Sequence, residues 1–134
     1  MQKLKGSCLC GKVTFEVANA FDKMFLCSCE QCRQITGSAF ASNLFTAAEG
    51  FSWLSGGSEI VTFKLPGHDI SKSFCPACGS GVPWSSGDGT KMIVPAGSLQ
   101  GEPKVADMVR IFVAEQPSWS SHFDQVEAHQ GFPS

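Results

Sequence analysis

The sequence lacks any run of about eighteen apolar residues, the length that a membrane-spanning helix requires. Its opening stretch, MQKLKGSCLCGK, has lysines but no apolar segment of the kind that follows the basic residues of a secretory signal peptide. The lysines and arginines are scattered, so the chain also lacks the basic stripe typical of nucleic-acid binding. From these absences we expect a cytoplasmic protein that binds neither nucleic acid nor a membrane.

Charged residues are scarce, at 16% of the 134 residues, whereas 43% of the residues are hydrophobic. This composition supports one buried core, and the length fits one ordinary domain. We therefore expect residues 1–134 to form a single domain. The 14 glycines and 7 prolines favour short strands joined by turns over long helices.

The pattern of hydrophobic residues predicts many short strands and no helix of three turns. Residues 12–18 alternate Val13, Phe15 and Val17 with polar residues, which is typical of a half-buried strand. Further strands are expected at residues 23–28, 39–47, 51–55, 59–65, 70–74, 82–86, 91–97 and 108–114. Residues 29–38 are expected to form a tight turn, of at most one helical turn, that ends at Gly37. The prediction is a mainly β domain with its cysteines on loops and strand ends.

The seven cysteines fall into three groups, namely Cys8 and Cys10; Cys27, Cys29 and Cys32; and Cys75 and Cys78. An odd number of cysteines cannot all pair within one disulfide-bonded monomer. In the cytoplasm thiols stay reduced, and clustered cysteines more often bind metal than form disulfides. We therefore interpret the three groups as metal ligands.

The segment CPACG, residues 75–79, carries the strongest single signal. In Cys-x-x-Cys-Gly two thiolates face one metal across a tight turn, and Gly79 supplies the positive φ that the turn needs. The alternative is a redox pair of the thioredoxin type, which opens a helix inside a βαβ unit. No such unit is expected here, so we interpret Cys75 and Cys78 as two ligands of a tetrahedral zinc ion.

The other two ligands of that zinc can come from Cys8 and Cys10. In an extended backbone residues i and i+2 project to the same face, so both sulfurs could reach one ion. The alternative is that both cysteines are small buried hydrophobic residues, but the flanking Gly6, Ser7 and Gly11 indicate a metal-binding loop.

The segment CSCEQC, residues 27–32, holds three thiols without a fourth. Cys27 and Cys29 share a face, and Cys32 lies where the chain turns back, so the three can occupy three corners of a tetrahedron. A histidine could close the site, but none has ligand spacing among the three in the chain, His68, His122 and His129. Three protein ligands with an open position are typical of a catalytic zinc.

Spacing alone leaves another partition of the cysteines open. The pair at residues 75 and 78 could instead join the first two cysteines of CSCEQC, which would leave Cys8, Cys10 and Cys32 over. In the favoured partition we expect two zinc ions per chain, the second of them labile.

An open zinc site with three thiolates is a weaker acid toward water than a three-histidine site, because its net formal charge is negative. It is well suited to binding a further thiol and keeping it as thiolate, the nucleophilic form. The site therefore indicates addition of a thiol to an electrophilic carbon. Arg33, next to Cys32, is a candidate for attracting an anionic thiol, and it is equally interpretable as a surface cation.

Five segments within residues 5–120 together contain all seven cysteines: GSCLCGKVTFEV, CSCEQCRQITGSAF, FCPACGSGV, VPAGSL and RIFVAEQPSW. In this order they resemble the glutathione-dependent formaldehyde-activating enzyme (GFA) family, which includes centromere protein V. The resemblance implies an Mss4-like β-tent fold, in which short antiparallel strands surround zinc-binding cysteine clusters.

The resemblance also implies a role for each cysteine. It assigns a structural zinc to Cys8, Cys10, Cys75 and Cys78, and a catalytic zinc to Cys27, Cys29 and Cys32. The implied activity is that of a carbon–sulfur lyase of the S-(hydroxymethyl)glutathione synthase type. Its partners would be a small thiol such as glutathione and a small aldehyde such as formaldehyde.

Three residues depart from the usual pattern of that family. Ser28 stands where histidine is usual, Glu30 stands where serine is usual, and Arg110 stands where histidine is frequent. All the cysteines are present, so these departures bear on the substrate rather than on zinc binding.

Two further interpretations belong to other functional classes. A non-catalytic, zinc-stabilised module that binds proteins would need only the four-thiolate site, and CSCEQC would then be metal-free or capped by a fourth protein ligand. Redox chemistry would need a lone reactive cysteine with a resolving partner, and no cysteine stands apart from a group. Trp84, Trp119 and Phe40 fit either the wall of a substrate cleft or the core.

Overall fold

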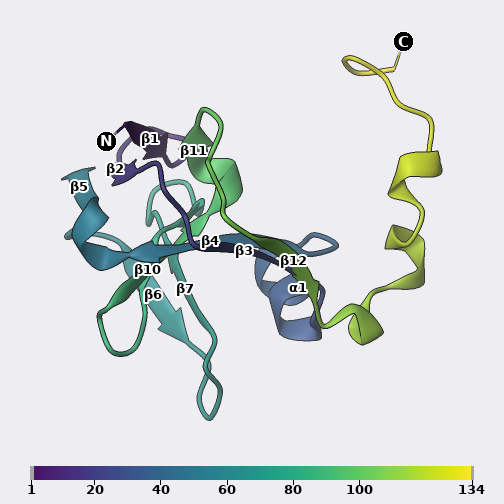
Figure 1. Cartoon of the computed structure of the whole chain (residues 1–134), viewed down its shortest axis with the longest axis horizontal. Helices are drawn as coiled ribbons and strands as arrows, with labels where there is room; N and C mark the ends of the chain where they lie inside the picture. Colours follow the sequence, from purple (N-terminus) through teal and green to yellow (C-terminus); the bar gives the residue numbers. More distant parts are fainter. Residues whose placement is uncertain (1, 134) are drawn as a thin grey trace.

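The computed structural model describes residues 2–133 and is mainly β (Figure 1). Its strands are β1 Lys3–Ser7, β2 Thr14–Ala18, β3 Lys23–Cys27, β4 Ala41–Ala47, β5 Phe51–Ser55, β6 Val61–Lys64, β7 Ser71–Phe74, β8 Gly81–Val82, β9 Trp84–Ser85, β10 Lys91–Pro95, β11 Leu99–Gln100 and β12 Met108–Ile111. The α-helix α1 spans Glu30–Thr36, and single 3₁₀ turns lie at η1 Ala48–Gly50, η2 Ala96–Ser98, η3 Val113–Glu115, η4 Ser118–Ser120 and η5 Phe123–Gln125. Within the described residues no helix is long and apolar enough to cross a membrane.

The strands form three sheets, with the orders β11-β1-β2-β5, β12-β3-β4-β10-β9 and β6-β7-β8. Paired neighbours run antiparallel, apart from β12, which runs parallel to β3. The predicted fold class, a β-tent of short antiparallel strands around cysteine clusters, is confirmed.

Several predicted elements differ from the observed ones in their bounds. The strand predicted at 51–55 is observed without change, but the one at 108–114 ends at Ile111 because Phe112 adopts a left-handed φ of 53°. The single strand predicted at 82–86 is wrong. Pro83 separates β8 from β9, which belong to different sheets, because proline has no N–H with which to continue a ladder.

Two elements near the cysteines were not predicted as they are observed. In β1 the buried positions are Leu4 and Gly6, and a glycine gives no hydrophobic signal for a strand. The segment after Cys29 forms seven residues of helix, which is about two turns rather than one. Gly37 ends α1 as predicted, with a φ of 66° and its N–H donating to the carbonyl of Arg33 at 2.8 Å.

The core has two parts, and one of them includes cysteines. The larger part lies between the first two sheets and contains Leu4, Phe15, Val17, Phe21, Met24, Leu44 and Val94. The smaller part contains Cys8, Val13, Cys75 and Val82, with Trp53 and Ile60 packed against it. Two of the thiols are therefore embedded in the hydrophobic core rather than mounted on its surface.

Gly6 is required by the way β1 packs on β2. Gly6 stands opposite Phe15 in the register, and the Phe15 ring lies over the glycine. A Cβ on Gly6 would come within 2.6 Å of Phe15 Cε2, which is closer than van der Waals contact allows. The ring also stacks on Phe51 with centroids 5.4 Å apart, so it cannot move without disturbing β5.

We therefore expect Gly6→Ala to lower the free energy of unfolding by about 1–3 kcal/mol, the usual cost of overpacking a core. Chemical denaturation of the zinc-loaded protein measures this change. The control is Gly87→Ala, because Gly87 has open space around its Cβ position and no left-handed φ. An equal loss of stability in the two variants would contradict the role assigned to Gly6.

The chain after β12 leaves the body of the molecule beside α1 and runs along one side of it (Figure 1). We call residues 117–133 the C-terminal arm. Its regular structure within the described chain is limited to the single turns η4 and η5.

Candidate metal centres

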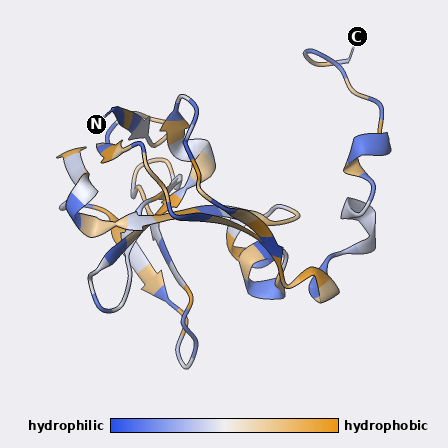
Figure 2. Cartoon of the chain, in the orientation of Figure 1, coloured by the Kyte–Doolittle hydropathy of each residue, from blue (hydrophilic) through white to orange (hydrophobic). Residues whose placement is uncertain are grey.

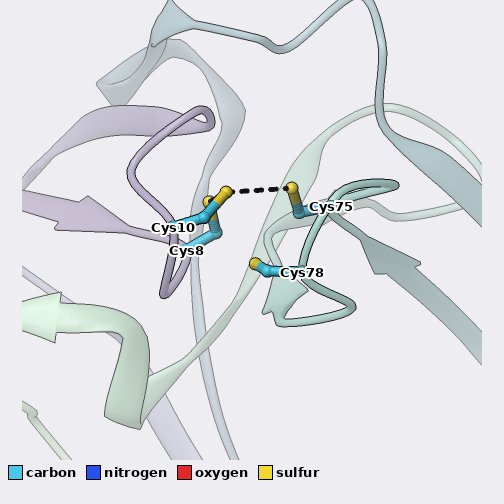
Figure 3. A group of neighbouring side chains, drawn as sticks. All are labelled: Cys8, Cys10, Cys75 and Cys78. Atoms are coloured by element: carbon cyan, nitrogen blue, oxygen red, sulfur yellow. Dashed lines mark hydrogen bonds between the residues drawn. The ribbon is translucent and has the colours of Figure 1, made fainter.

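The first cysteine group joins two loops that lie far apart in the sequence. Cys8 and Cys10 come from the turn between β1 and β2, and Cys75 and Cys78 come from the turn between β7 and β8. Figure 3 shows the four sulfurs turned toward a common centre, with the two pairs facing each other. The four sulfur atoms all lie within 4.8 Å of one another.

Backbone hydrogen bonds shape the turn that carries Cys8 and Cys10. The N–H of Gly11 donates to the Cys8 carbonyl at 3.2 Å, and Gly11 has a φ of 85°. The Val13 N–H donates to the Cys8 sulfur at 3.3 Å. The extended backbone predicted for Cys8 and Cys10 is therefore wrong, because the chain already turns there to form the β1–β2 hairpin. The turn brings the two sulfurs together by a different route.

The turn that carries Cys75 and Cys78 has the geometry predicted for CPACG. Gly79 has a φ of 76°, and its N–H donates to the Cys75 carbonyl at 2.8 Å. Ser80 connects the two loops, since its hydroxyl accepts the N–H of Leu9 at 3.0 Å. The two halves of the four-cysteine group are thus aligned by hydrogen bonds of the chain itself.

The environment of this group favours thiolate at two of its four cysteines. The hydroxyl and backbone N–H of Ser80 hydrogen bond to the Cys78 sulfur and lower the pKa of that thiol to about 5. Burial raises the pKa of Cys8, but the Val13 N–H and the sulfurs of Cys10 and Cys75 outweigh burial and lower the pKa overall. The Lys12 N–H lowers the pKa of Cys10, but desolvation and the three other sulfurs together raise it to about 11. A cation bound among the sulfurs would offset the repulsion between neighbouring thiolates and so favour the deprotonated form of Cys10.

The second group, Cys27, Cys29 and Cys32, lies where β3 passes into α1. Cys27 is the last residue of β3, Cys29 is the N-cap of α1, and Cys32 lies in its first turn. The Cys29 sulfur accepts the N–H of Cys32 at 3.4 Å, which caps the helix. The three sulfurs lie within 4.8 Å of one another, and within residues 2–133 no histidine, aspartate or glutamate joins them.

Burial dominates the electrostatics of the three-cysteine group. Desolvation raises the pKa of Cys27 and, together with the two neighbouring sulfurs, that of Cys32. Negative charge is therefore disfavoured in this group unless a cation is bound. Metal binding here must displace protons from the thiols.

Both groups fit zinc by their donor atoms, and the four-cysteine group also fits it by its sulfur–sulfur distances. Two sulfurs at about 2.3 Å from one tetrahedral zinc stand about 3.8 Å apart. The sulfurs of Cys8 and Cys10 are 3.6 Å apart, and those of Cys10 and Cys75 are 3.8 Å apart. A disulfide would need about 2.05 Å, and all seven cysteines are free thiols.

Contacts from distant segments hold both ends of α1. At its start the Glu115 carboxylate accepts the N–H of Glu30 at 3.1 Å. At its end Lys72 Nζ, on β7, donates to the carbonyl of Ile35 at 2.7 Å. The negative Glu115 carboxylate also complements the positive start of the helix dipole, and the positive Lys72 ammonium complements its negative end. The helix that supplies two of the three cysteines is therefore fixed to the sheet β6-β7-β8.

Arg33 contacts the same loop rather than open solvent. Its Nε donates to the Ser28 carbonyl at 3.0 Å, and within the described part of the chain Arg33 does not line the large cleft beside Cys27. The observed contact braces the backbone between the cysteines. The role of Arg33 toward an anionic thiol stays a prediction.

A cleft of about 1160 Å³ opens beside the three-cysteine group, and Cys27 and Cys32 lie in its wall. Its floor is apolar, with Phe25, Phe45 and Ile93 from β3, β4 and β10. A small molecule in the cleft can therefore reach Cys27 and Cys32. Volumes of about 300–1000 Å³ are usual for small-molecule sites, so this cleft is large.

The hairpin formed by β6 and β7 supplies the charged groups of the cleft, Lys64, Asp69 and Lys72. Sequence reasoning missed these residues. The sequence indicated only the turn at residues 66–69 between the two strands that carry them. Nothing in the sequence showed that this hairpin faces CSCEQC. Of the three aromatic candidates, Trp84 lines the cleft, whereas Trp119 lies in the exposed C-terminal arm.

Two of the three unusual residues lie together. Ser28 and Arg110 both line a small pocket of about 250 Å³, together with Phe40. Because side chains alternate along a strand, this pocket is on the opposite side of the chain from the large cleft. The departures at Ser28 and Arg110 therefore do not alter the cleft at Cys27.

Most of the chain matches a known protein family. The model of the family described as "Glutathione-dependent formaldehyde-activating enzyme" matches residues 3–115. The fold also resembles that in the crystal structure of a Rhodobacter sphaeroides protein, with a TM-score of 0.60 and 21% sequence identity. That match covers 78% of this chain and 99% of the other, so part of this chain has no counterpart there.

Proposed function

Because the chain belongs to the glutathione-dependent formaldehyde-activating enzyme family, we propose that it is a zinc-dependent carbon–sulfur lyase. It would join a small thiol such as glutathione to formaldehyde or a related aldehyde. The observation that carries this proposal is that two members of the three-cysteine group, Cys27 and Cys32, line an open cleft, and that the group contains only three ligands among the described residues. In the proposal the four-cysteine group holds a structural zinc, because it has four ligands and is part of the core.

Zinc held by three thiolates would offer its fourth position to the sulfur of the substrate thiol and keep that sulfur in the nucleophilic thiolate form. In the reaction a bond forms between sulfur and the carbonyl carbon, and the carbonyl π electrons move to oxygen. The oxygen takes up the proton that the thiol has lost, so the addition needs no oxidant or reductant. Cys27 and Cys32 present the site to the cleft, and Phe25 and Phe45 would provide apolar contacts for the aldehyde.

The charged hairpin supports a zwitterionic thiol as substrate. Glutathione has carboxylates at both ends and an ammonium group at one. The ammonium of Lys64 can pair with a carboxylate, and the carboxylate of Asp69 can pair with the ammonium. Lys72 is held by the Ile35 carbonyl and adds positive potential to the same wall.

The test is the rate at which glutathione and formaldehyde exchange with their adduct at equilibrium, measured by exchange NMR on the zinc-loaded protein. We expect exchange well above the spontaneous rate, and no acceleration by a variant that lacks a cysteine of the three-cysteine group. Exchange that equals the spontaneous rate for glutathione and for other small thiols would overturn the proposal.

Metal content provides a second prediction. Reduced protein is expected to bind two zinc ions per chain, and a chelator is expected to remove first the ion that has only three protein ligands. Glutathione is expected to slow this removal, whereas S-methylglutathione, which has no thiol to donate, leaves it unchanged. Metal analysis after timed chelation measures both effects.

The competing view, a non-catalytic binding module, makes the opposite prediction. It requires one tightly held zinc and three thiols whose reactivity does not respond to glutathione. That result would remove the basis for catalysis while leaving the four-cysteine site intact.

A further inference from the structure

The apolar floor of the large cleft begins beside Cys27 and continues across four strands. Phe25 lies two residues before Cys27 on β3, so both side chains are on the same face of the sheet, about 7 Å apart along the strand. The Phe25 ring meets the Phe45 ring edge to face, with centroids 5.2 Å apart. Phe45 on β4 pairs with Ile93 on β10, which pairs with Trp84 on β9. All four residues line the cleft, and we call Phe25, Phe45, Ile93 and Trp84 the apolar floor.

The sheet that carries the apolar floor is apolar on both faces. Its strands carry hydrophobic residues between hydrophilic ones (Figure 2). Met24, Leu44 and Val94, each next in sequence to a residue of the floor, point to the opposite face and belong to the larger part of the core. The three aromatic residues of the floor are only half-buried. A second apolar face that borders a cleft instead of the core indicates a surface that a ligand covers.

Formaldehyde is too small to cover this surface. Phe45 stands opposite Lys23, four residues before Cys27, so the floor extends about 13 Å along the strands from Cys27. Formaldehyde adds a single carbon to the sulfur of the thiol. The charged ends of glutathione are complemented by Lys64 and Asp69 of the β6–β7 hairpin rather than by the floor. The group that covers the floor must therefore belong to the other reactant, the aldehyde.

We propose that the aldehyde taken by this cleft carries a large apolar group, and that an aromatic ring suits the floor best. This inference rests on the proposed lyase function and names its second substrate. The thiol sulfur bonds to the carbonyl carbon and the thiol proton passes to the oxygen, so the product is a hemithioacetal and nothing is oxidised or reduced. The ring of the aldehyde then packs on Phe25 and Phe45, as aromatic rings pack on one another in protein cores.

The first test compares two aldehydes, propanal and 3-phenylpropanal, in the exchange of glutathione with its adduct. Two methylene groups separate the ring from the carbonyl, so the spontaneous reactions are nearly equal. At concentrations below saturation we expect the zinc-loaded protein to accelerate exchange at least about tenfold more for 3-phenylpropanal, because its ring is buried on the floor. Equal acceleration would overturn the inference. So would a greater acceleration for 2-phenylethanethiol with formaldehyde, because the apolar group would then belong to the thiol.

The second test changes the floor itself. Asn43 is half-buried, lines the cleft and stands opposite Phe25 in the register. Asn43→Leu extends the apolar surface and is expected to raise the ratio of the two accelerations. Asn43→Asp places a carboxylate beside Phe25 and is expected to lower the ratio toward one. The matched control is Gln34→Glu, which also converts an amide to a carboxylate, on an exposed position of α1 that does not line the cleft. A ratio that is the same in all these variants would contradict the role of the floor.

The third test needs no catalysis. S-propylglutathione and S-(3-phenylpropyl)glutathione are thioethers that cannot react, and titration calorimetry measures their affinity for the zinc-loaded protein. We expect the phenyl compound to bind at least about tenfold more tightly. Equal affinities in a protein that exchanges formaldehyde would overturn this inference alone. Tighter binding of the phenyl compound by a protein that accelerates no aldehyde would overturn the lyase function, and with it an aldehyde as the ligand.

Discussion

The Cys29→Ser variant is expected to bind one zinc ion per chain and to lose catalysis while keeping its fold. Serine retains an oxygen that can accept the Cys32 N–H, so the N-cap of α1 survives and the free energy of unfolding changes by less than about 1 kcal/mol. The oxygen is not a thiolate, and the remaining two cysteines are too few to hold the ion. Mutation of a residue that only orients a metal ligand typically lowers metal affinity or activity by about 10–100-fold. Loss of a ligand itself is therefore expected to lower both by more than this factor.

Metal analysis, far-ultraviolet circular dichroism and the adduct-exchange rate together check this expectation. The control is Gln34→Ala, because Gln34 is exposed on the same helix, is not a member of the cysteine group and does not line the cleft. Two zinc ions and full activity in Cys29→Ser would mean that the catalytic centre is elsewhere.

The Cys75→Ser variant is expected to be unfolded at room temperature. Cys75 is 1% exposed and is packed in the smaller part of the core. Binding of a structural zinc contributes about 10–16 kcal/mol to folding, as much as the whole stability of about 5–15 kcal/mol that is usual for a domain. Loss of one of four thiolates therefore threatens the fold, whereas loss of one of three at CSCEQC does not.

Circular dichroism and the dispersion of amide signals in an NMR spectrum measure this outcome. Ala77→Ser is the control, since Ala77 is exposed in the same turn and lies between the two cysteines without belonging to the group. If Cys75→Ser folds with normal stability, the four-cysteine group is not the structural centre, and the assignment of the two groups must be exchanged.

The sequence was sufficient to predict the groups of cysteines but not their partition. Spacing along the chain allowed the pair at 75 and 78 to join either Cys8 and Cys10 or the first cysteines of CSCEQC. The structure brings that pair to Cys8 and Cys10 because Ser80 accepts the N–H of Leu9 across the two loops. This is a contact between residues 71 positions apart, and no local pattern encodes it.

Strands with alternating side chains were predictable, because burial of one face leaves a period of two in the sequence. The strand at Lys3–Ser7 was not, since one of its buried positions is a glycine covered by Phe15. The cleft could not be predicted from the sequence either. Its walls include residues from all five strands of the sheet β12-β3-β4-β10-β9 and from the β6–β7 hairpin of another sheet, and the relative placement of these sheets depends on packing between them.

The hydrogen bond from Lys72 to the Ile35 carbonyl has a consequence for the order in which the protein acquires metal. Lys72 lies on β7, which pairs with β6 and β8 and leads directly into Cys75, so one strand joins the four-cysteine group to the end of α1. The same strand holds the end of the helix that carries Cys32. On the proposed assignment of the two groups, we therefore expect zinc at the four-cysteine group to stabilise the strand that holds α1, and so to precede and favour capture of a second ion by the three-cysteine group.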